Sequence, residues 1–313
     1  MNILITGAAG FIGSHMAELL AASGYNVTGL DNFSPYYDVD LKKRNAAALE
    51  LKGIKILNKD LAEKEIYKSL PADFDFIIHF AAQPGISAQI EFEDYLRNNV
   101  IATQNLLVFA RGIKNLKHFF NISTSSIYGL DATFPETTAP APASNYGVSK
   151  LSAEQLVMAE SRSGNLHASS LRLYSVYGPR ERPEKLYTKL IKCAFNKESF
   201  TLFEGSEQHL RSFTYVGDIV KGILAAVERH TALNGEIINL GSEESYSTRE
   251  GIEIVEQQLE VKIGIQVVPR RAGDQLQTAA KIDKAKELLG YTAPTTLAQG
   301  LKEQIAWYKA EFL

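Results

Sequence analysis

The first thirteen residues limit what this chain can fold into more than any other stretch. Residues 2–6 (NILIT) are apolar and rich in β-branched side chains, which is typical of a buried strand. The sequence GAAGFIG follows at 7–13, and a helical pattern continues to about residue 23. Glycines between a strand and a helix permit a tight turn and let phosphates approach the helix N-terminus. The unit predicts a dinucleotide site, although its G-x-x-G-x-x-G spacing is not the commoner G-x-G-x-x-G; a purely structural turn is the alternative.

The end of the second predicted strand indicates which dinucleotide binds. Residues 26–30 have a strand pattern, and Asp31 follows them. A carboxylate at this position can accept hydrogen bonds from the adenosine ribose hydroxyls. No arginine follows at once, because the next residues are Asn32, Phe33 and Ser34. The sequence therefore favours NAD over NADP.

Strands and helices alternate as far as residue 173. Strands are predicted at 54–57, 74–80, 117–122 and 167–173, with helices at 94–110 and 146–162. This alternation predicts an α/β fold with a Rossmann-type doubly wound parallel sheet. Ligands of such sheets bind at the carboxyl ends of the strands. Small or polar residues follow several strands, namely Asp60-Leu61, Ala81-Ala82-Gln83, Thr124-Ser125-Ser126 and Tyr174-Ser175.

Tyr146 and Lys150 are spaced for chemistry on one helix face. Side chains at i and i+4 project from the same face, one turn apart. An ammonium beside a phenol favours the phenolate and lowers the tyrosine pKa from about 10. Such a phenolate can accept a proton from an alcohol near neutral pH. The same spacing also occurs on solvated helix faces, so the strand-end residues are what make a catalytic base the favoured interpretation.

The chain changes character after residue 173. Residues 177–183 (YGPRERP) form a charged loop, followed by a predicted helix at 184–196 and strand at 201–203. Residues 234–240 are predicted to return to the main sheet as a strand, and helices are predicted at 248–260, 283–289 and 296–311. We therefore expect an NAD-binding domain of residues 1–173 plus about 213–241. Residues 174–212 and 242–313 would form a smaller, mostly helical substrate domain.

Composition excludes several protein classes. The net charge of −3 gives no reason to expect nucleic acid or an anionic membrane as a partner. No apolar run approaches the roughly 20 residues of a membrane span, and the N-terminus does not resemble a signal peptide. Cys193 is the only cysteine, which fits a reducing, cytoplasmic location. The six histidines show no spacing typical of a metal site.

These motifs together resemble the extended short-chain dehydrogenase/reductase family, in its NAD-dependent epimerase/dehydratase branch. The resemblance covers essentially the whole chain. It depends on the glycine motif, the hydroxyl-rich strand end before 127–129 (IYG), the Y-x-x-x-K spacing and residues 211–216 (RSFTYV). Within the branch, residues 31–38 (DNFSPYYD), 41–42 (LK) and 176–183 (VYGPRERP) are similar to UDP-glucuronic acid 4-epimerases.

The resemblance implies roles for particular residues. Tyr146 would be the base, Lys150 its electrostatic partner and a ligand of the nicotinamide ribose, and Thr124 the third catalytic residue. The candidate contacts of NAD are Gly7, Gly10, Phe11, Ile12, Gly13, Asp31, Asn32, Asp60, Leu61, Ala81, Ala82, Gln83, Asn98, Asn99, Tyr146, Lys150 and Tyr174. The candidate contacts of a UDP-sugar are Ser125, Ser126, Ser175, Arg182, Phe203, Arg211, Arg271 and Asp274. In the family these positions place Arg211, Arg271 and Asp274 at the diphosphate, Phe203 at the base, and Ser175 and Arg182 at a sugar carboxylate. The resemblance also implies a homodimer formed through the helices near 94–110 and 146–162.

Two positions depart from the family pattern. The family has Asp where this chain has Ser212, and glucuronate enzymes commonly have Arg where this chain has Ser87. The second departure removes an expected cation from the acid-binding site.

The expected reaction is NAD-dependent epimerisation at C4 through a 4-keto sugar. A 4,6-dehydratase of this family carries Asp-Glu after the Thr, and a decarboxylase carries Glu at the position of Ser126. Here Ser125 and Ser126 offer no carboxylate for general acid or base catalysis, so the sequence favours an epimerase over both. Alternatives are a 4-epimerase for UDP-glucose or UDP-N-acetylglucosamine, and a non-enzymatic NAD-binding protein. The cation Arg182 disfavours the first, and the complete Thr-Tyr-Lys set disfavours the second.

Overall fold

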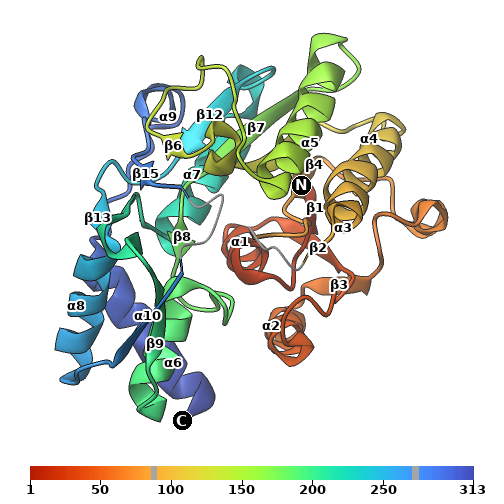
Figure 1. Ribbon diagram of the computed structural model, residues 1–313. Coiled ribbons are helices and arrows are strands. Elements are labelled where there is room, and N and C mark those ends of the chain that lie inside the picture. The colour runs from red at the N-terminus through yellow and green to blue at the C-terminus, as the bar shows by residue number, and fades with distance from the viewer. Residues whose placement is uncertain (86–89, 270–274) are drawn as a thin grey trace.

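A seven-stranded parallel sheet forms the centre of the protein (Figure 1). The computed structural model describes residues 1–85, 90–269 and 275–313. The strand order is β12-β7-β5-β4-β1-β2-β3, with every neighbouring pair parallel. The strands are β1 (Asn2–Thr6), β2 (Asn26–Asp31), β3 (Lys55–Asn58), β4 (Phe76–His79), β5 (His118–Thr124), β7 (Ala168–Leu173) and β12 (Ile237–Leu240). The predicted doubly wound sheet is therefore confirmed, including the return of residues 234–240 beside β7.

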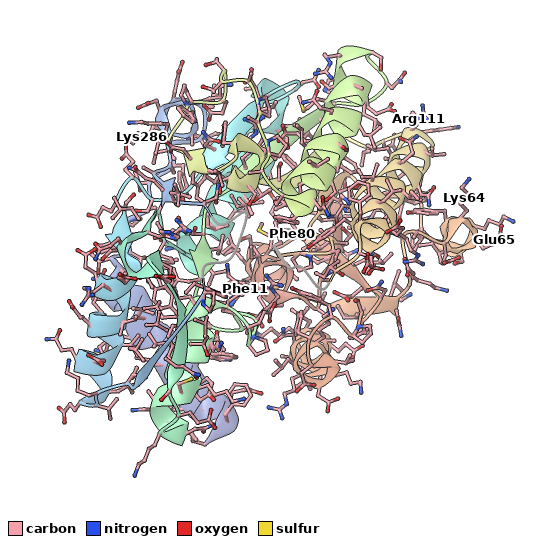
Figure 2. The ribbon with its side chains drawn as sticks, viewed as in Figure 1. Phe11, Lys64, Glu65, Phe80, Arg111 and Lys286 are labelled. Atoms are coloured by element: carbon pink, nitrogen blue, oxygen red, sulfur yellow. The ribbon has the colours of Figure 1, made fainter. Side chains whose placement is uncertain are left out.

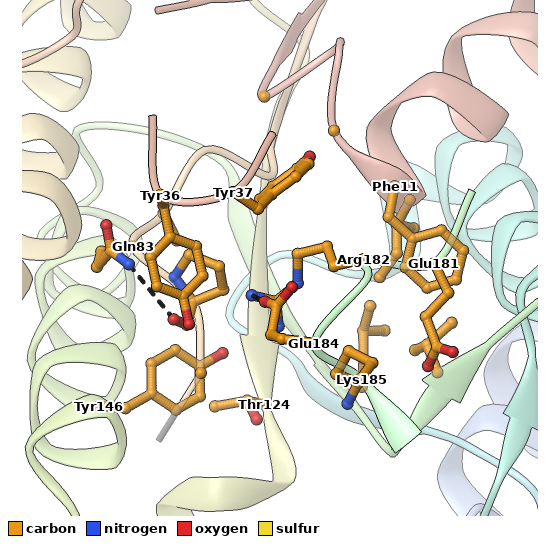
Figure 3. Close-up of a pocket in the computed structure, with 18 of the residues that line it drawn as sticks. Phe11, Tyr36, Tyr37, Gln83, Thr124, Tyr146, Glu181, Arg182, Glu184 and Lys185 are labelled. Atoms are coloured by element: carbon orange, nitrogen blue, oxygen red, sulfur yellow. Dashed lines mark hydrogen bonds and ion pairs between the residues drawn. The ribbon is translucent and has the colours of Figure 1, made fainter. Parts of the chain in front are cut away.

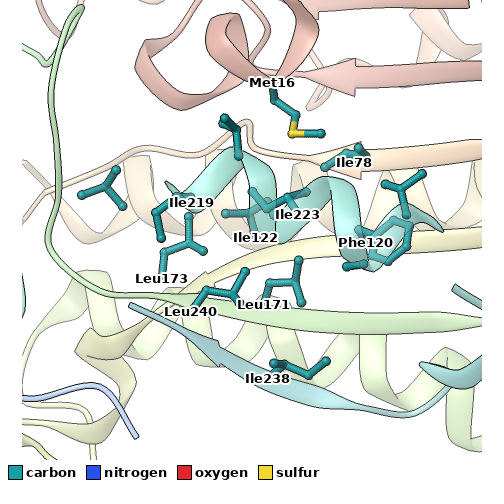
Figure 4. Close-up of a cluster of buried hydrophobic side chains, with 14 of the residues drawn as sticks. Met16, Ile78, Phe120, Ile122, Leu171, Leu173, Ile219, Ile223, Ile238 and Leu240 are labelled. Carbon is teal, nitrogen blue, oxygen red and sulfur yellow. The ribbon is translucent and has the colours of Figure 1, made fainter. Parts of the chain in front are cut away.

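Helices cover both faces of this sheet because alternate strand residues point to opposite sides. Ile3 and Ile5 belong to one buried cluster and Leu4 to another. The first cluster packs under α1 (Phe11–Ala22), α7 (Val216–Glu228) and α9 (Asp283–Leu289), and Figure 4 shows Met16, Ile219 and Ile223 in it. The second packs under α4 (Ala102–Arg111) and α5 (Asn145–Arg162). Near-continuous apolar strands with helices on both sides are typical of a parallel sheet.

The predicted helix at 94–110 is divided into three segments. It consists of α3 (Phe92–Tyr95), the π-helix η2 (Leu96–Ile101) and α4. The π-helical segment contains Asn99, which is buried and accepts a hydrogen bond from the backbone N–H of Gln83 at 2.6 Å. Its side-chain amide also donates to Gln83 O at 3.1 Å. A tertiary contact thus accompanies the irregular turn, which local periodicity does not predict.

The remaining elements form the second part of the chain and its connections. A separate apolar cluster joins α6 (Leu186–Asn196), α8 (Thr248–Leu259) and α10 (Leu297–Phe312), which lie together in Figure 1. The small sheets comprise β13-β10-β15-β6, β11-β8 and β14-β9. Their strands are β6 (Asp131–Ala132), β8 (Val176–Tyr177), β9 (Phe200–Phe203), β10 (Leu210–Arg211), β11 (Thr214–Tyr215), β13 (Tyr246–Ser247), β14 (Ile265–Val268) and β15 (Gln277–Thr278). Helix α2 (Val39–Leu51) and the short helices η1 (Lys64–Ser69), η3 (Ser125–Tyr128), η4 (Ser206–Gln208) and η5 (His230–Ala232) complete the described elements.

Several charged side chains lie at the periphery of the molecule. Lys64, Glu65 and Arg111 project outward in Figure 2, whereas Phe11 and Phe80 lie toward the centre. Of the helices that the structure describes, none has the length and apolar character needed to cross a membrane.

Candidate active site

A cavity of about 600 Å³ lies where the strands of the main sheet end. Its wall includes residues that directly follow β1, β2, β4 and β5, Ser175 two residues after β7, and residues from α6, β9 and β10 of the second part. Most of the candidate residues line it: Gly7, Gly10, Phe11, Ile12, Gly13, Asp31, Asn32, Asp60, Leu61, Ala81, Ala82, Gln83, Asn98, Thr124, Ser125, Ser126, Tyr146, Lys150, Ser175, Arg182, Phe203 and Arg211. Segments far apart in the sequence thus contribute to one site.

Two candidates do not line the cavity, and two lie outside the described residues. Asn99 is buried and holds the backbone of Gln83. Tyr174 has no exposed surface and packs against Gly241, where a Cβ would lie 2.8 Å from the Tyr174 Cβ. These two residues can affect a ligand only through the groups they support. Arg271 and Asp274 lie outside the described residues.

The glycine turn brings backbone close to backbone at the start of α1. A Cβ added to Gly13 would lie 2.2 Å from Gly7 O, and one added to Gly7 would lie 2.8 Å from Ala81 N. Gly7 also has φ +71°, a left-handed value that suits glycine. Gly10, the N-cap of α1, provides no side-chain cap, and the first turn contains no acidic residue. The uncapped N–H groups of the first turn, beside the cavity, suit the pyrophosphate of a dinucleotide.

Asp31 provides a buried carboxylate at the other side of this turn. It accepts hydrogen bonds from Ala9 N at 3.1 Å and Phe33 N at 2.9 Å. Burial raises the pKa of Asp31, while the charge of Lys42 and the two backbone bonds oppose this effect. Lys42 is itself buried, and its Nζ donates to Ser34 O at 2.9 Å. Asp31, the glycine turn and the small residues Ala81 and Ala82 therefore fit the expected adenosine half of NAD.

Tyr146 and Lys150 both face the cavity from the first turns of α5. Ser144 caps this helix by accepting a hydrogen bond from Gly147 N at 3.1 Å. Burial raises the pKa of Tyr146, opposed by a hydrogen bond with Thr124 and the charge of Arg182. The sequence predicted that Lys150 would lower this pKa, and that prediction is wrong for the protein alone. The Lys150 Nζ instead donates to Ile122 O at 2.7 Å, and desolvation of the phenol dominates.

A buried ionic network lies behind Lys150. Burial lowers the pKa of Lys150 to about 8, and the charge of Glu154, one turn further along α5, opposes this shift. Glu154 accepts from Arg172 Nη2 at 2.6 Å and Nε at 3.0 Å, and Arg172 Nη1 donates to the Tyr128 hydroxyl at 2.7 Å. The network connects the catalytic helix to β7 and to η3. Glu154 was not among the predicted site residues, although its i+4 spacing from Lys150 is visible in the sequence.

The end of β5 presents hydroxyls and no carboxylate. Thr124 Oγ1 accepts from Ser126 N at 3.1 Å and donates to Ser126 Oγ at 3.3 Å. Ser125 is buried, and its backbone oxygen accepts from Gln275 Nε2 at 3.3 Å. These bonds fix the turn from β5 into η3 beside Tyr146.

Arg182 lies between Tyr36 and Glu184 in the middle of the cavity (Figure 3). Its Nη1 is 2.6 Å from Glu184 Oε1, and its guanidinium carbon is 5.5 Å from the centre of the Tyr36 ring. Tyr36 and Tyr37, from the segment similar to UDP-glucuronic acid 4-epimerases, both line the cavity. The ion pair with Glu184 was not predicted. Ser175, which lines the same cavity, has φ +28°.

Cations gather on the wall contributed by the second part of the chain. Arg211 donates to Leu210 O at 3.1 Å and also to Gln275 O. Lys185, Lys189 and His209 line the same cavity but were not identified from the sequence. Lys185 and Lys189 are four residues apart at the start of α6, and this spacing is the sequence signal that could have identified them. Arg211, Lys185 and Lys189 form a positively charged wall suited to an anionic ligand.

Of the two positions that depart from the family pattern, the structure describes Ser212 but not Ser87. Ser212 is fully buried, and it donates from its backbone to Thr278 Oγ1 at 2.9 Å and from its hydroxyl to Ser242 O. It supports the segment after Arg211 and does not line the cavity. Ser87 lies outside the described residues. Within residues 1–85, 90–269 and 275–313, no group of three or more His, Cys, Asp or Glu side chains could hold a metal ion.

Known proteins resemble this chain over its whole length. UDP-glucuronate 4-epimerase 4 of Arabidopsis thaliana is 34% identical, with the match covering 98% of this chain and 75% of that protein. The Bacillus subtilis protein YtcB, described as an uncharacterized UDP-glucose epimerase, is 37% identical over 98% of both chains. The crystal structure of UDP-glucuronic acid 4-epimerase from Bacillus cereus, in complex with UDP-glucuronic acid and NAD, is 36% identical with a TM-score of 0.94 over all of both chains.

The family itself is also identified by a sequence profile. The profile described as NAD dependent epimerase/dehydratase family matches residues 3–241, which include the glycine turn, the Thr124 strand end and the Tyr146–Lys150 helix. This chain therefore belongs to the NAD dependent epimerase/dehydratase family.

Proposed function

We propose that this protein epimerises a UDP-hexuronic acid at C4, converting UDP-glucuronate to UDP-galacturonate, with NAD held in the site. The observation that carries the proposal is that Thr124, Tyr146, Lys150 and Arg182 line one cavity. The similarity to the UDP-glucuronate 4-epimerases of Bacillus cereus and Arabidopsis thaliana supports the same substrate.

Tyr146 would accept and return the proton of the sugar 4-hydroxyl. Its hydrogen bond with Thr124 and the charge of Arg182 favour the phenolate against burial. Lys150, anchored on Ile122 O, would add positive charge on the same side. Bound NAD would supply the oxidation at C4 and its reversal, which no side chain here can perform.

Arg182 would bind the carboxylate of the sugar. A guanidinium is a planar, permanently charged donor that matches a carboxylate. Ser125, Ser126 and Ser175 line the same cavity and would hold the carboxylate in position. This matters because a 4-keto-uronate is a β-keto acid, which loses carbon dioxide when the breaking bond aligns with the carbonyl π system. Fixed hydroxyls and Arg182 would keep the carboxylate out of that alignment.

The nucleotide end would occupy the cationic wall of the second part. Arg211 and the newly identified Lys185 and Lys189 are placed to neutralise a diphosphate, and Phe203 to contact the base. Arg271 and Asp274 keep the diphosphate role implied by the family resemblance. We retain, also as a proposal, the division into residues 1–173 with 213–241 and residues 174–212 with 242–313. The separate apolar cluster around α6, α8 and α10 supports it.

The test is to incubate purified protein with UDP-glucuronate, without added cofactor, and follow the sugar by proton NMR. The proposal expects UDP-galacturonate to accumulate without carbon dioxide release. Turnover of UDP-glucose with no galacturonate signal would refute the uronate assignment. Loss of deuterium from C4 to solvent would refute direct return of the hydrogen.

A 4-epimerase for a neutral UDP-hexose is the second candidate. The specific observation in its favour is that Arg182 already has a carboxylate partner, Glu184, at 2.6 Å. The likeness to YtcB agrees with it. Parallel NMR assays with UDP-glucose and UDP-N-acetylglucosamine separate the two candidates.

A cytoplasmic homodimer is the proposed state of the enzyme. Exposed apolar side chains lie on the helices expected to form the interface, namely Phe92, Leu96, Ile101, Val108 and Val148. Sedimentation equilibrium tests the proposal, with a Val108→Glu variant expected to shift the protein to monomers.

A further inference from the structure

Glu184 is an acidic residue in the centre of a cavity that also contains the residues expected to bind an acidic sugar. Its carboxylate Oε1 lies 2.6 Å from Arg182 Nη1. Arg182 is 14% exposed at its side chain and lies over the Tyr36 ring, whereas the Glu184 side chain is 41% exposed. Figure 3 shows both side chains extending into the cavity, between Tyr146 and Lys185. The more buried member of the pair is thus the cation.

We propose that Glu184 is a displaceable stand-in for the substrate carboxylate and sets the preference of the site between acidic and neutral sugars. This inference rests on the proposed uronate function. In the free enzyme Glu184 occupies the guanidinium and keeps it neutralised. When a hexuronate binds, its carboxylate takes the place of Glu184 on Arg182, and Glu184 turns toward solvent.

The contacts of the two side chains explain why Glu184 is the partner that moves. Within the described part of the chain, Glu184 has no second hydrogen-bond or ion-pair partner. Arg182 is the more buried partner, and its guanidinium also lies over the Tyr36 ring. An ion pair with an exposed carboxylate contributes little stability, because water replaces the lost partner.

Electrostatics explain why the exchange is selective. Two carboxylates on one guanidinium repel each other, so a bound hexuronate and a paired Glu184 exclude one another. A neutral hexose needs no exchange, because Arg182 remains neutralised by Glu184. Glu184 therefore weakens hexuronate binding by the cost of its own displacement and leaves hexose binding nearly unaffected. The same charge modulates Tyr146, because the positive charge of Arg182 is one of the groups that favour its phenolate.

The experiment measures ligand binding to the NAD-loaded enzyme and to its E184Q and E184A variants by calorimetry. The probes are UDP-glucuronate, UDP-glucose and UDP. We expect UDP-glucuronate to bind about 3- to 10-fold more tightly in both variants. UDP-glucose and UDP should bind within about twofold of wild type. The matched control is Glu207→Gln, which removes the same charge from η4, between the lining residues Ser206 and His209, without contact to Arg182.

Three results would overturn the inference. Equal tightening of all three ligands in the E184 variants would mean that Glu184 acts only through the general field of the cavity. The same selective tightening in Glu207→Gln would remove the need for direct contact with Arg182. Loss of turnover by about two orders of magnitude or more in E184Q would make Glu184 a participant in the chemistry. Failure of the proposed function gives a different result: the wild-type enzyme would then leave UDP-glucuronate unconverted.

Discussion

Glu154 and Arg172 form an ion pair with almost no solvent contact, one helical turn beyond Lys150. Arg172 Nη2 lies 2.6 Å from Glu154 Oε1, and the two side chains are 0% and 2% exposed for Glu154 and Arg172 respectively. Glu154 is also the group whose charge opposes the effect of burial on Lys150. One carboxylate therefore supports both the sheet-to-helix packing and the protonation of the lysine.

Glu154→Gln should make the enzyme lose activity at lower pH than wild type. Burial lowers the pKa of Lys150 to about 8, and removing the opposing charge lowers it further. Lys150 acts as the protonated ammonium, so the alkaline limb of the kcat/KM profile moves toward neutral pH. The substitution also leaves buried Arg172 without its charged partner, which should reduce the free energy of unfolding by about 3–5 kcal/mol. Kinetics across the neutral and alkaline range and urea denaturation measure the two effects.

Ser170→Ala is the matched control for Glu154→Gln. The Ser170 hydroxyl donates to Glu154 Oε2 at 3.2 Å, so the variant removes a contact but no charge. Its pH profile should match wild type. An activity loss in Glu154→Gln by one factor at every pH would show that only packing was disturbed.

Tyr146→Phe should retain NAD but lose turnover by about 10²–10⁴-fold, because the hydroxyl that exchanges a proton with the sugar is gone. Cofactor content is measured by releasing and quantifying NAD, and turnover by NMR. Tyr25→Phe, remote from the cavity wall, is the control and should keep both. Turnover near the wild-type rate in Tyr146→Phe would contradict the assignment of the base.

Lys150→Met should stabilise the protein at neutral pH while abolishing turnover. The folded-state pKa of Lys150, about 8, lies below its ordinary value of 10.5. Folding therefore disfavours the protonated lysine below pH 8, and this cost decreases as pH rises and the folded lysine loses its proton. The gain should be about 1–3 kcal/mol near neutral pH and smaller in alkaline buffer, by urea denaturation.

The control for Lys150→Met is Lys43→Met, an exposed lysine whose removal should change stability by less than about 0.5 kcal/mol. A Lys150→Met protein less stable than wild type at neutral pH would mean that the bond to Ile122 O outweighs the burial of the charge.

Gly13→Ala should lower the bound NAD about tenfold or more. The added Cβ would lie 2.2 Å from Gly7 O, so the turn must open and its N–H groups must move. Displacing packed backbone costs about 1–3 kcal/mol. Gly112→Ala is the control, because Gly112 has an ordinary φ of −79° and the nearest atom to its Cβ is 3.2 Å away. Full NAD content in Gly13→Ala would contradict the proposed cofactor cradle.

Arg182→Met should reduce kcat/KM for UDP-glucuronate by about 100-fold, since a bound carboxylate would lose its charged partner at a cost of about 2–5 kcal/mol. The loss for UDP-glucose should be clearly smaller, because it reflects only the charge that Arg182 contributes to the Tyr146 phenolate. Equal losses for both sugars would indicate that Arg182 organises the cavity and does not read the acid group.

Local patterns predicted much of the framework. The apolar runs that became β1, β4 and β5 are recognisable because both faces of a parallel strand are buried. The glycine turn, Asp31 and the Tyr146–Lys150 spacing are also recognisable, because each depends on residues that are close together in the sequence. Helix 94–110 was predicted as continuous. Its π-helical segment was missed because local periodicity does not reveal the hydrogen bond between Asn99 and Gln83, sixteen residues away.

Sequence alone determined the order of the main-sheet strands along the chain, the glycine turn and the identity of the residues at each strand end, but it did not indicate α2 or α7. Only the tertiary structure decided how those residues behave. It paired Arg182 with Glu184, placed Glu154 and Arg172 behind Lys150, and brought Lys185 and Lys189 to the same cavity. It also raised the pKa of Tyr146, where the sequence predicted the opposite. The physical reason is that spacing along a chain specifies which groups can be neighbours, whereas desolvation and Coulomb energy depend on everything that surrounds them.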